Sequence, residues 1–382
     1  MKITFQETPE QLQLIKAMGS KNANESRAAQ EAFAALLSPR LGQFFLQADT
    51  TQFLYKTLAF AADSDPSFPL ELFAEVPEGY YHIWSAGMPG GVPTNTIHQP
   101  IEEVKFTTYR MDSAWSILSK YARTMRLPII AKALERLMQE VLLKTNHQAW
   151  SVVLAALAQA RHDFRGTNTG HVFASQAADK FTLDDFSQLL TFFRRLNSSW
   201  SGGTPVGGAS KPTDMIVSPE MVEKFRAMSY NPINTHAANE ITATANSGTV
   251  ALPDSERANL WSSGGVPTFL NVNILELLEL GSNQDYQVLF ESFIGSTDLP
   301  RISTGTASGE TFSAANDELV IIVDATKDIG HRAIASDSDT GSVFSLEPDD
   351  QFLKRSGKIG WFGGIEEGRL VLDTRGLAAL VV

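Results

Sequence analysis

Apolar residues recur at helical spacing in the longest regular pattern of the chain, over residues 128–161. A four–three–four spacing relates its main apolar positions, which are Ile130, Leu134, Leu137 and Val141. Pro128 suits the first helical turn, because the N–H that proline lacks would have no partner there. The pattern predicts one helix about 50 Å long at ~1.5 Å per residue, with Thr145-Asn146 as the place where a break would fall.

The N-terminal part has a weaker helical pattern, over residues 8–37. Thr8, Pro9 and Gln11 have the spacing of an N-cap, a first-turn proline and a capping-box partner. Residues 38–70 follow no clear period and hold several aromatic side chains. They predict an arm that lies against another surface.

A long hairpin is predicted next, because aromatic and branched residues from Tyr80 to Ser85 are typical of a strand. A tip rich in glycine and proline follows over 87–93, and Val104 to Tyr109 is predicted to return. The outgoing strand has large side chains on both faces, and a two-stranded hairpin alone is marginal in water. We expect another copy of the chain to cover it; cover by the rest of the same chain is the alternative.

The remaining pattern predicts alternating helices and strands. Asp112–Arg123 is expected to form a short helix capped by Asp112, and Thr182 to cap a helix that follows it. Asp214–Val217 is expected to form a buried strand, with Ser218-Pro219-Glu220 starting the next helix. Further strands are predicted over 268–277, 286–294 and 318–324, and in parts of 358–382.

Composition narrows the class of protein. The net charge of −12 disfavours direct recognition of nucleic acid, because the grip on phosphates comes from Lys and Arg. The chain has no cysteine, which excludes disulfides and thiolate metal sites. The N-terminus lacks the apolar core of a signal peptide, and no apolar stretch is long enough for a bilayer. We expect a soluble protein made in a cytoplasm, with no membrane partner.

The sequence offers no metal site and no phosphate loop. The seven histidines do not form a pair at the spacing of a metal-binding helix face: His82, His98, His147, His162, His171, His236 and His331. The glycine-rich loop 202–211 has its lysine late and a proline after it, which is the wrong order for a phosphate cradle. It is interpreted as a flexible loop.

Other short motifs also lack the pattern that their chemistry needs. In Gly305–Gly309 the serine is displaced by one position from a nucleophile elbow, and Gly363-Gly364 with Gly368 has the wrong spacing for a dinucleotide fingerprint. Glu102-Glu103 would point to opposite faces of a strand, and Asp349-Asp350 has the same spacing. No catalytic, cofactor-binding or metal-binding residue is therefore predicted.

The order of the predicted elements resembles the major capsid protein of tailed bacteriophages, the Hong Kong ninety-seven type of capsid fold. An N-terminal arm, a long excursion with a Gly/Pro tip and a spine helix precede a mixed α/β domain with the piece Met215-Ile216-Val217-Ser218-Pro219-Glu220-Met221. Strand-like segments close the chain. The resemblance covers nearly the whole chain at the level of element order, and it implies an α+β fold with a peripheral and an axial domain.

The resemblance divides the chain into five segments. They are an N-terminal arm (1–60), an extended loop with flanking strands (61–115), a peripheral domain with the spine helix (116–180), an axial α/β domain (181–355) and a return to the peripheral domain (356–382). The arm and the extended loop would lie on neighbouring subunits. The implied interface residues are Tyr80, Tyr81, His82, Ile83, Trp84, Val104, Lys105, Phe106, Phe44 and Phe45.

The function that the resemblance implies is structural. The protein would assemble as hexamers and pentamers of an icosahedral virion shell around phage DNA, without sequence-specific contact to that DNA. A portal and a separate scaffolding protein would be partners, and a cement protein a further one. Lys105 is the only lysine of the hairpin and lies away from its tip, so covalent crosslinking between subunits is not expected.

Other classes of protein stay open at this point. An encapsulin-like nanocompartment would share the fold and would be distinguished by a cargo enzyme inside the particle. A cytoplasmic α/β hydrolase would need convergent polar groups in a pocket. A tail or baseplate protein is a third alternative.

Overall fold

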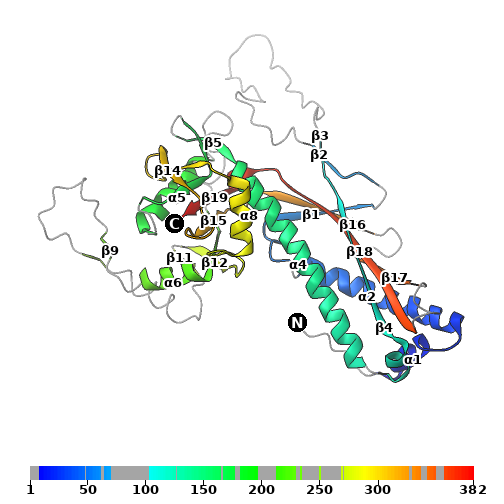
Figure 1. Cartoon of the computed structure of the whole chain (residues 1–382). Helices are drawn as coiled ribbons and strands as arrows, with labels where there is room; N and C mark the ends of the chain where they lie inside the picture. The colour runs from blue at the N-terminus through cyan, green and yellow to red at the C-terminus, as the bar shows by residue number, and fades with distance from the viewer. Residues whose placement is uncertain are drawn as a thin grey trace, which may run out of the picture. The chain divides into compact units, whose positions relative to one another are not determined.

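The fold is α+β, with its two largest sheets in different compact units (Figure 1). Unit 1 comprises residues 1–72, 100–150 and 330–370, and unit 2 comprises 73–99, 151–329 and 371–382. The computed structural model describes residues 8–47, 49–61, 64–69, 103–125, 127–164, 167–176, 181–196, 212–228, 233–234, 249–250, 268–269, 271–326, 329–336, 342–349 and 357–382.

Unit 1 is built on a five-stranded sheet. Its order is β1-β16-β18-β17, and β4 pairs with β18. The strands are β1 (Tyr55–Ala61), β4 (Tyr109–Leu118), β16 (Gly330–Ser336), β17 (Ser345–Asp349) and β18 (Lys358–Val371). β1 runs parallel to β16, whereas β4 and β17 are antiparallel to β18. The sheet therefore joins strands from both ends of the sequence.

Helices supply the rest of the unit 1 core. They are α1 (Pro9–Met18), α2 (Ala23–Gln47), α3 (Ser119–Arg123) and the first part of α4 (Leu127–Gln159). The Trp361 ring of β18 stacks on Trp115 of β4 with 4.4 Å between centroids, and Phe33 of α2 lies 5.5 Å from it. These rings connect the sheet to the helical layer.

Unit 2 contains a six-stranded sheet in the order β11-β12-β8-β15-β19-β7. The strands are β7 (Val172–Ala174), β8 (Asp214–Val217), β11 (Thr268–Phe269), β12 (Val272–Glu276), β15 (Leu319–Val323) and β19 (Leu377–Val381). Every residue of β15 and β19 is buried, as expected of central strands covered on both faces.

In the described part of unit 2, the last turns of α4 are followed by α5 (Leu183–Leu196), α6 (Pro219–Met228) and α8 (Asp285–Ile294). α5 and α6 contribute phenylalanines, among them Phe186 and Phe225, to one apolar cluster with the sheet. Short strand pairs complete the described structure: β5 (Arg161–Phe164) with β6 (Thr167–Gly170), β9 (Ile233–Asn234) with β10 (Thr249–Val250), and β13 (Asp298–Pro300) with β14 (Ala307–Thr311).

The long helix predicted from the apolar spacing is confirmed. α4 runs without a break from Leu127 to Gln159, and Figure 1 shows it as one continuous ribbon. At the predicted weak point, the Thr145 hydroxyl donates a hydrogen bond of 2.8 Å to the Val141 carbonyl. The threonine is thereby satisfied inside the helix.

Several other local predictions are confirmed. β8, α6 and β15 lie where the sequence placed them. The predicted strand 268–277 is instead two short antiparallel strands, β11 and β12, on either side of Asn271, which has φ of 67°. Thr182 caps α5 as predicted: the Asp185 N–H donates to its hydroxyl, and the Thr182 N–H donates to the Asp185 carboxylate. Thr8 precedes α1, but its side chain makes no capping hydrogen bond.

The prediction that residues 38–70 lack a regular pattern is wrong, while their role as an arm stays a prediction. α2 continues through Pro39 to Gln47, because a row of buried apolar side chains at every fourth position extends beyond the proline. That row is Phe33, Leu37, Leu41 and Phe45. β1 and β2 (Ser67–Pro69) then follow, so the segment is mostly regular.

The predicted hairpin is only partly described and stays a prediction. β3 (Glu103–Lys105) lies at the start of the predicted returning segment and pairs with β2, in the register Ser67↔Lys105. Tyr80 to Ser85 lies outside the described residues. The described part of this excursion is therefore its base.

Two predictions of element type are wrong. Asp112 to Leu118 belongs to strand β4, because β4 pairs with β18 from Tyr109↔Glu367 to Leu118↔Lys358. Residues 286–294 form helix α8, whose buried side chains Tyr286, Phe290 and Ile294 recur at every fourth position.

The predicted division into five segments stays a prediction. In the structure, β16 and β17 pair within the sheet of unit 1. β19 pairs with β15 and β7 in unit 2, so strands that are neighbours in the sequence belong to different sheets.

Candidate functional site

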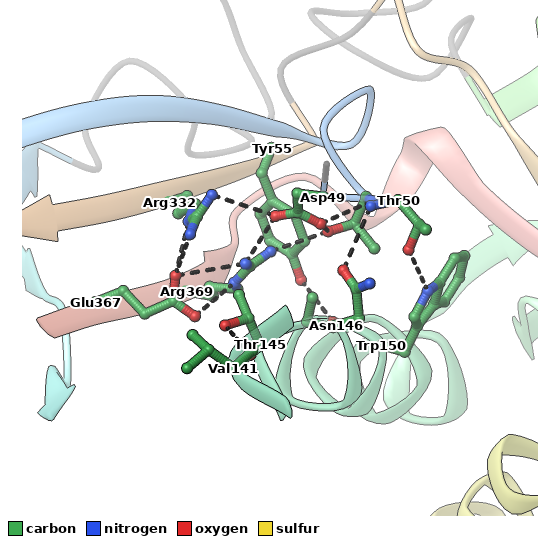
Figure 2. A network of polar contacts seen from close by, with 12 residues as sticks. Asp49, Thr50, Tyr55, Val141, Thr145, Asn146, Trp150, Arg332, Glu367 and Arg369 are labelled. Atoms are coloured by element: carbon green, nitrogen blue, oxygen red, sulfur yellow. Dashed lines mark hydrogen bonds and ion pairs between the residues drawn. The ribbon is translucent and has the colours of Figure 1, made fainter. Parts of the chain in front are cut away.

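Four charged side chains meet inside unit 1, where three segments far apart in the sequence come together (Figure 2). Asp49 follows α2, Arg332 lies on β16, and Glu367 and Arg369 lie on β18. Glu367 and Arg369 are two positions apart, so they share one face of their strand. All four side chains are at most 3% exposed. We call these residues the arginine–carboxylate cluster.

Each arginine of the cluster contacts both carboxylates. Arg369 Nη2 lies 2.8 Å from Asp49 Oδ2, and Arg369 Nε lies 3.3 Å from Glu367 Oε1. Arg332 Nε donates to Glu367 Oε2 at 2.7 Å, and Arg332 Nη1 lies 3.3 Å from Asp49 Oδ2. The formal charges cancel, which is what allows four ionised groups to be buried together.

Neighbouring residues add hydrogen bonds on both sides of the cluster. Thr51 donates its backbone N–H to Asp49 Oδ1 at 2.9 Å, and its hydroxyl accepts from Arg369 Nη1 at 2.9 Å. The Tyr109 hydroxyl of β4 donates to Glu367 Oε1 at 2.6 Å.

Tyr55 joins the cluster to α4. The Arg369 guanidinium lies over the Tyr55 ring, 5.1 Å from its centroid, and the Tyr55 hydroxyl donates to the Ala149 carbonyl at 3.0 Å. Close by, Trp150 Nε1 donates to the Thr50 hydroxyl at 3.4 Å (Figure 2). The turn after α2 is thus attached both to β18 and to α4.

The ionisation of the cluster follows from these contacts. Burial alone would raise the pKa of Asp49, but Arg369, the hydrogen bonds from Thr51 and Arg332 together outweigh it, so this pKa lies below its usual range. Burial also raises the pKa of Tyr109, and the adjacent Glu367 carboxylate raises it further. Tyr109 therefore stays a hydrogen-bond donor at neutral pH.

The arrangement suits holding segments together better than it suits catalysis. Guanidinium groups do not exchange protons near neutral pH, and both carboxylates already accept hydrogen bonds from them. Among the described residues, no group of three or more His, Asp or Glu side chains is placed to bind a metal ion. The sequence reasoning missed this cluster; its one local signal is the spacing of Glu367 and Arg369, two positions apart in a strand with many buried residues.

The histidines lie apart in the described structure. His171 is buried, and its Nδ1 lies 2.8 Å from the Leu377 carbonyl. His147 is on α4 and His331 is on β16, while His162 is on β5 with its side chain outside the described residues. His82, His98 and His236 lie outside the described residues.

The glycine motifs have structural explanations where they are described. Ser308 lies in β14, within a hairpin and not at a strand–helix turn. A Cβ at Gly363 would lie 2.8 Å from the Phe344 ring and 2.9 Å from the Ser345 carbonyl, and one at Gly368 would lie 2.9 Å from the Thr107 carbonyl. Close strand packing therefore explains these glycines of β18. The loop 202–211 lies outside the described residues.

The two acidic pairs are only partly described. Glu103 lies in β3, with its side chain outside the described residues, and Glu102 is not described. Asp349 ends β17, and Asp350 is not described.

The predicted interface residues fall into three groups. Tyr80, Tyr81, His82, Ile83 and Trp84 lie outside the described residues. Val104 is half-buried and Lys105 is exposed on β3, beside the buried Phe106. Phe45 is buried against Phe344 in the core of unit 1, with Phe44 half-buried next to it. Their role in an interface stays a prediction.

Comparison with known proteins gives similarity in structure only. No family model and no curated protein sequence matches the chain. The chain is similar to the capsid structure of the cyanophage P-SCSP1u, with 12% identity, coverage of 86% of both chains and a TM-score of 0.44. It is also similar to the capsid of an empty GTA particle, with 9% identity, coverage of 87% and 89%, and a TM-score of 0.46.

A third similar structure is the holo-SrpI encapsulin complex from Synechococcus elongatus PCC 7942. It has 8% identity, coverage of 86% of this chain and 84% of that chain, and a TM-score of 0.42. None of the helices in the described ranges has both the length and the apolar character required to cross a bilayer.

Proposed function

We propose that the chain is the major capsid protein of a tailed bacteriophage, a structural subunit that forms hexamers and pentamers of an icosahedral shell around DNA. The observation that carries the proposal is the pairing of β2 with β3. Pro69 pairs with Glu103, so the two residues that flank segment 70–102 lie side by side in the structure.

The composition of this excursion, residues 70–102, supports contact with other subunits. It contains Phe73, Tyr80, Tyr81 and Trp84. A loop of this length is uncommon in a compact domain unless it binds something. Its aromatic side chains need apolar cover, and a neighbouring copy would supply it.

Exposed apolar side chains on unit 2 support a second contact area. Leu275 on β12 and Leu278 just after it are 38% and 70% exposed, and Val288 and Phe293 on α8 are 49% and 37% exposed. Several large exposed apolar side chains on consecutive elements are typical of interaction surfaces. A subunit that meets neighbours on more than one side can form a closed shell.

The interior of unit 1 supports a structural role. Its buried charges are paired with one another, and they join the turn after α2 to strands from the C-terminal part of the chain. That arrangement stabilises a subunit and leaves no group poised for proton transfer in the cluster.

The proposal places the protein in the virion shell, after synthesis in the host cytoplasm. Its partners would be other copies of itself, a portal and a separate scaffolding protein, with a cement protein as a further partner. The enclosed DNA would make no sequence-specific contact, which agrees with the net charge of −12.

Electron microscopy and sedimentation velocity of the purified protein test the proposal. We expect capsomers or shells from the full chain, and mainly single subunits from a variant in which residues 73–99 are replaced by a short Gly-Ser linker. Circular dichroism of the variant checks that both units still fold. A full chain that stays monomeric over a wide range of concentration and salt would contradict the proposal, and particles that contain a cargo enzyme in place of DNA would favour an encapsulin-like compartment.

A further inference from the structure

A cationic depression lies in unit 1 where α1, α3 and the start of β18 meet. Two adjoining hollows of about 470 and 550 Å³ share Gly19, Ser20, Lys21 and Arg123 in their walls. Five cationic side chains line them together, against the single carboxylate of Glu25: Lys16, Lys21, Arg27, Arg123 and Lys358. We call these five residues the cationic notch.

Backbone contacts fix the shape of the notch. Arg123 Nε donates to the Gly19 carbonyl at 2.6 Å, and the Ser119 N–H donates to the Gly357 carbonyl at 2.9 Å. A Cβ at residue 19 would lie 2.7 Å from Arg123 Cγ and 2.9 Å from the Arg123 backbone nitrogen, so glycine allows this close approach. The end of α1, α3 and the start of β18 are therefore held together.

The lysines of the notch are available to a partner. Lys16, Lys21 and Lys358 are exposed, and within the described part of the chain no carboxylate forms an ion pair with them. Glu25, in turn, accepts a hydrogen bond from the Ser20 hydroxyl at 2.9 Å. Arg27 pairs with Glu31 at 2.9 Å, so the positive charge of the notch comes mainly from the three lysines and Arg123. This charge is concentrated in a chain whose net charge is −12.

Beside the notch, two large apolar side chains are exposed at the two ends of α3. Leu118 and Met125 are each 41% exposed, and Met125 has φ of 51°, which is uncommon for a residue other than glycine. A partner that matches this surface carries carboxylates together with apolar side chains.

The excursion of the same chain has that composition. Residues 57–104 contain no Lys or Arg, and their seven carboxylates are Asp63, Asp65, Glu71, Glu75, Glu78, Glu102 and Glu103. Glu71, Glu75 and Glu78 alternate with Leu72, Phe73 and Val76, and the aromatic residues follow them. No other stretch of this length in the sequence lacks basic residues while carrying so many carboxylates.

The excursion is also long enough to reach another subunit. Pro69 and Glu103, which flank residues 70–102, pair with each other in the structure. Half of that segment is about 16 residues, whose greatest possible reach is roughly 50 Å at about 3.3 Å per residue.

We infer that the cationic notch of one copy binds the acidic, aromatic excursion of a second copy, an inference that rests on the proposed self-assembly. The ion pairs would fix the position of the excursion, and Leu118 and Met125 would cover part of its apolar side chains. Nucleic acid is the other class of polyanion that a cationic surface could bind. In the whole chain, the 43 acidic residues outnumber the 31 basic residues. This net negative charge repels a phosphate backbone, so the peptide is the favoured partner.

Charge reversal with a second-site rescue tests the inference. In Lys16→Glu/Lys21→Glu/Lys358→Glu, we expect the fraction of subunits in particles to fall at least tenfold, and Glu71→Lys/Glu75→Lys/Glu78→Lys in the same chain to restore it. Lys132→Glu/Lys144→Glu, which reverses two exposed lysines of α4, is the matched control and should assemble like the wild type. Unchanged circular dichroism shows that loss of assembly does not reflect unfolding.

Disulfide trapping identifies the donor of the excursion, because the chain has no cysteine of its own. Mixed Lys21→Cys and Glu75→Cys chains should give an oxidised dimer on a denaturing gel, whereas a control mixture of Lys132→Cys and Glu75→Cys chains should not. A link that forms only within one doubly substituted chain would overturn the inference.

The remaining outcomes also decide the matter. Normal assembly of the notch variant, or a loss of DNA binding without a loss of assembly, would overturn the inference and leave the proposed function intact. A wild-type chain that forms no particles at all would instead contradict the proposed function.

Discussion

The interiors of the two main sheets differ in the kind of contact that stabilises them. In unit 2, β15 is a continuous apolar run from Leu319 to Val323, and its neighbours bury aliphatic side chains against the phenylalanines of α5 and α6. In unit 1, β18 buries Glu367 and Arg369 against Asp49 and Arg332.

The difference concerns specificity more than strength. Apolar contacts tolerate exchange of partners of similar volume, whereas each charge of the cluster is tolerated only when its own partners are present. Unit 1 collects segments from three parts of the sequence. The paired charges therefore select which segments pack together in unit 1. We expect the removal of one charged side chain to lower the free energy of unfolding more than the loss of a methylene group from the apolar core of unit 2.

The largest expected effect is from Arg369→Ala. Removal of this guanidinium leaves Asp49 and Glu367 buried with only Arg332 to compensate them, which should lower the free energy of unfolding by about 3–5 kcal/mol. Urea denaturation measures it. The control is Arg27→Ala, whose ion pair with Glu31 is exposed and should contribute less than about 1 kcal/mol. If both variants lose equally little, the cluster does not hold unit 1 together.

Close packing of β18 should give the next largest effect, in Gly363→Ala. The added methyl group would meet the Phe344 ring and the Ser345 carbonyl at under 3 Å, so we expect a loss of about 1–3 kcal/mol. Gly170→Ala in unit 2 is the matched control, because its Cβ would have its nearest neighbours at 3.9 Å. Thermal denaturation of the two variants should separate them; equal melting temperatures would argue against steric restriction in β18.

The apolar interior of unit 2 should respond more gently to a conservative change. Ile322→Val removes one methylene group from a fully buried position and should cost about 0.5–1.5 kcal/mol. Val288→Ala, at an exposed position on α8, should stay within about 0.5 kcal/mol of the wild type. A loss from Ile322→Val as large as that from Arg369→Ala would remove the contrast between the units.

Acid should weaken the cluster of unit 1. The pKa of Asp49 is lower in the folded chain than its unfolded value of about 3.9, so its stabilising effect is complete well above that value. The effect is lost as the pH falls through about 3.9 towards the folded pKa. Arg369→Ala removes the strongest of the contacts that lower this pKa, so its unfolding free energy should depend less on pH between 5 and 3 than that of the wild type. Parallel curves for the two proteins would contradict this.

The smallest effect is expected in unit 2, with the opposite sign. Burial raises the pKa of Glu318, although the 2.7 Å hydrogen bond from Ser218 acts against it. Its favourable contribution is therefore present below the unfolded value of about 4.3 and is lost as the pH rises through the folded pKa. Glu318→Gln should make the protein slightly more stable at pH 7, and denaturation at pH 4 should show that gain disappear. A gain that persists at pH 4 would assign it to a different cause.

The sequence determined the elements whose signals are local. The four–three–four spacing of α4, the capping pair of Thr182 and Asp185, and the apolar run of β15 each lie within one segment. These patterns reflect side-chain periodicity and backbone hydrogen bonding among near neighbours, which the sequence states directly. The α+β class and the absence of a familiar catalytic motif could be read in the same way.

Only the tertiary structure decided the elements whose partners are distant. Asp112 to Leu118 became a strand because β18, far along the chain, offers it a matching edge, and α2 continued past Pro39 because Phe344 and its neighbours bury Phe45. The arginine–carboxylate cluster depends on the same long-range register. Its four charges attract one another strongly only after burial has removed water from between them. Burial of this kind depends on residues far apart in the sequence, so no local spacing predicts it.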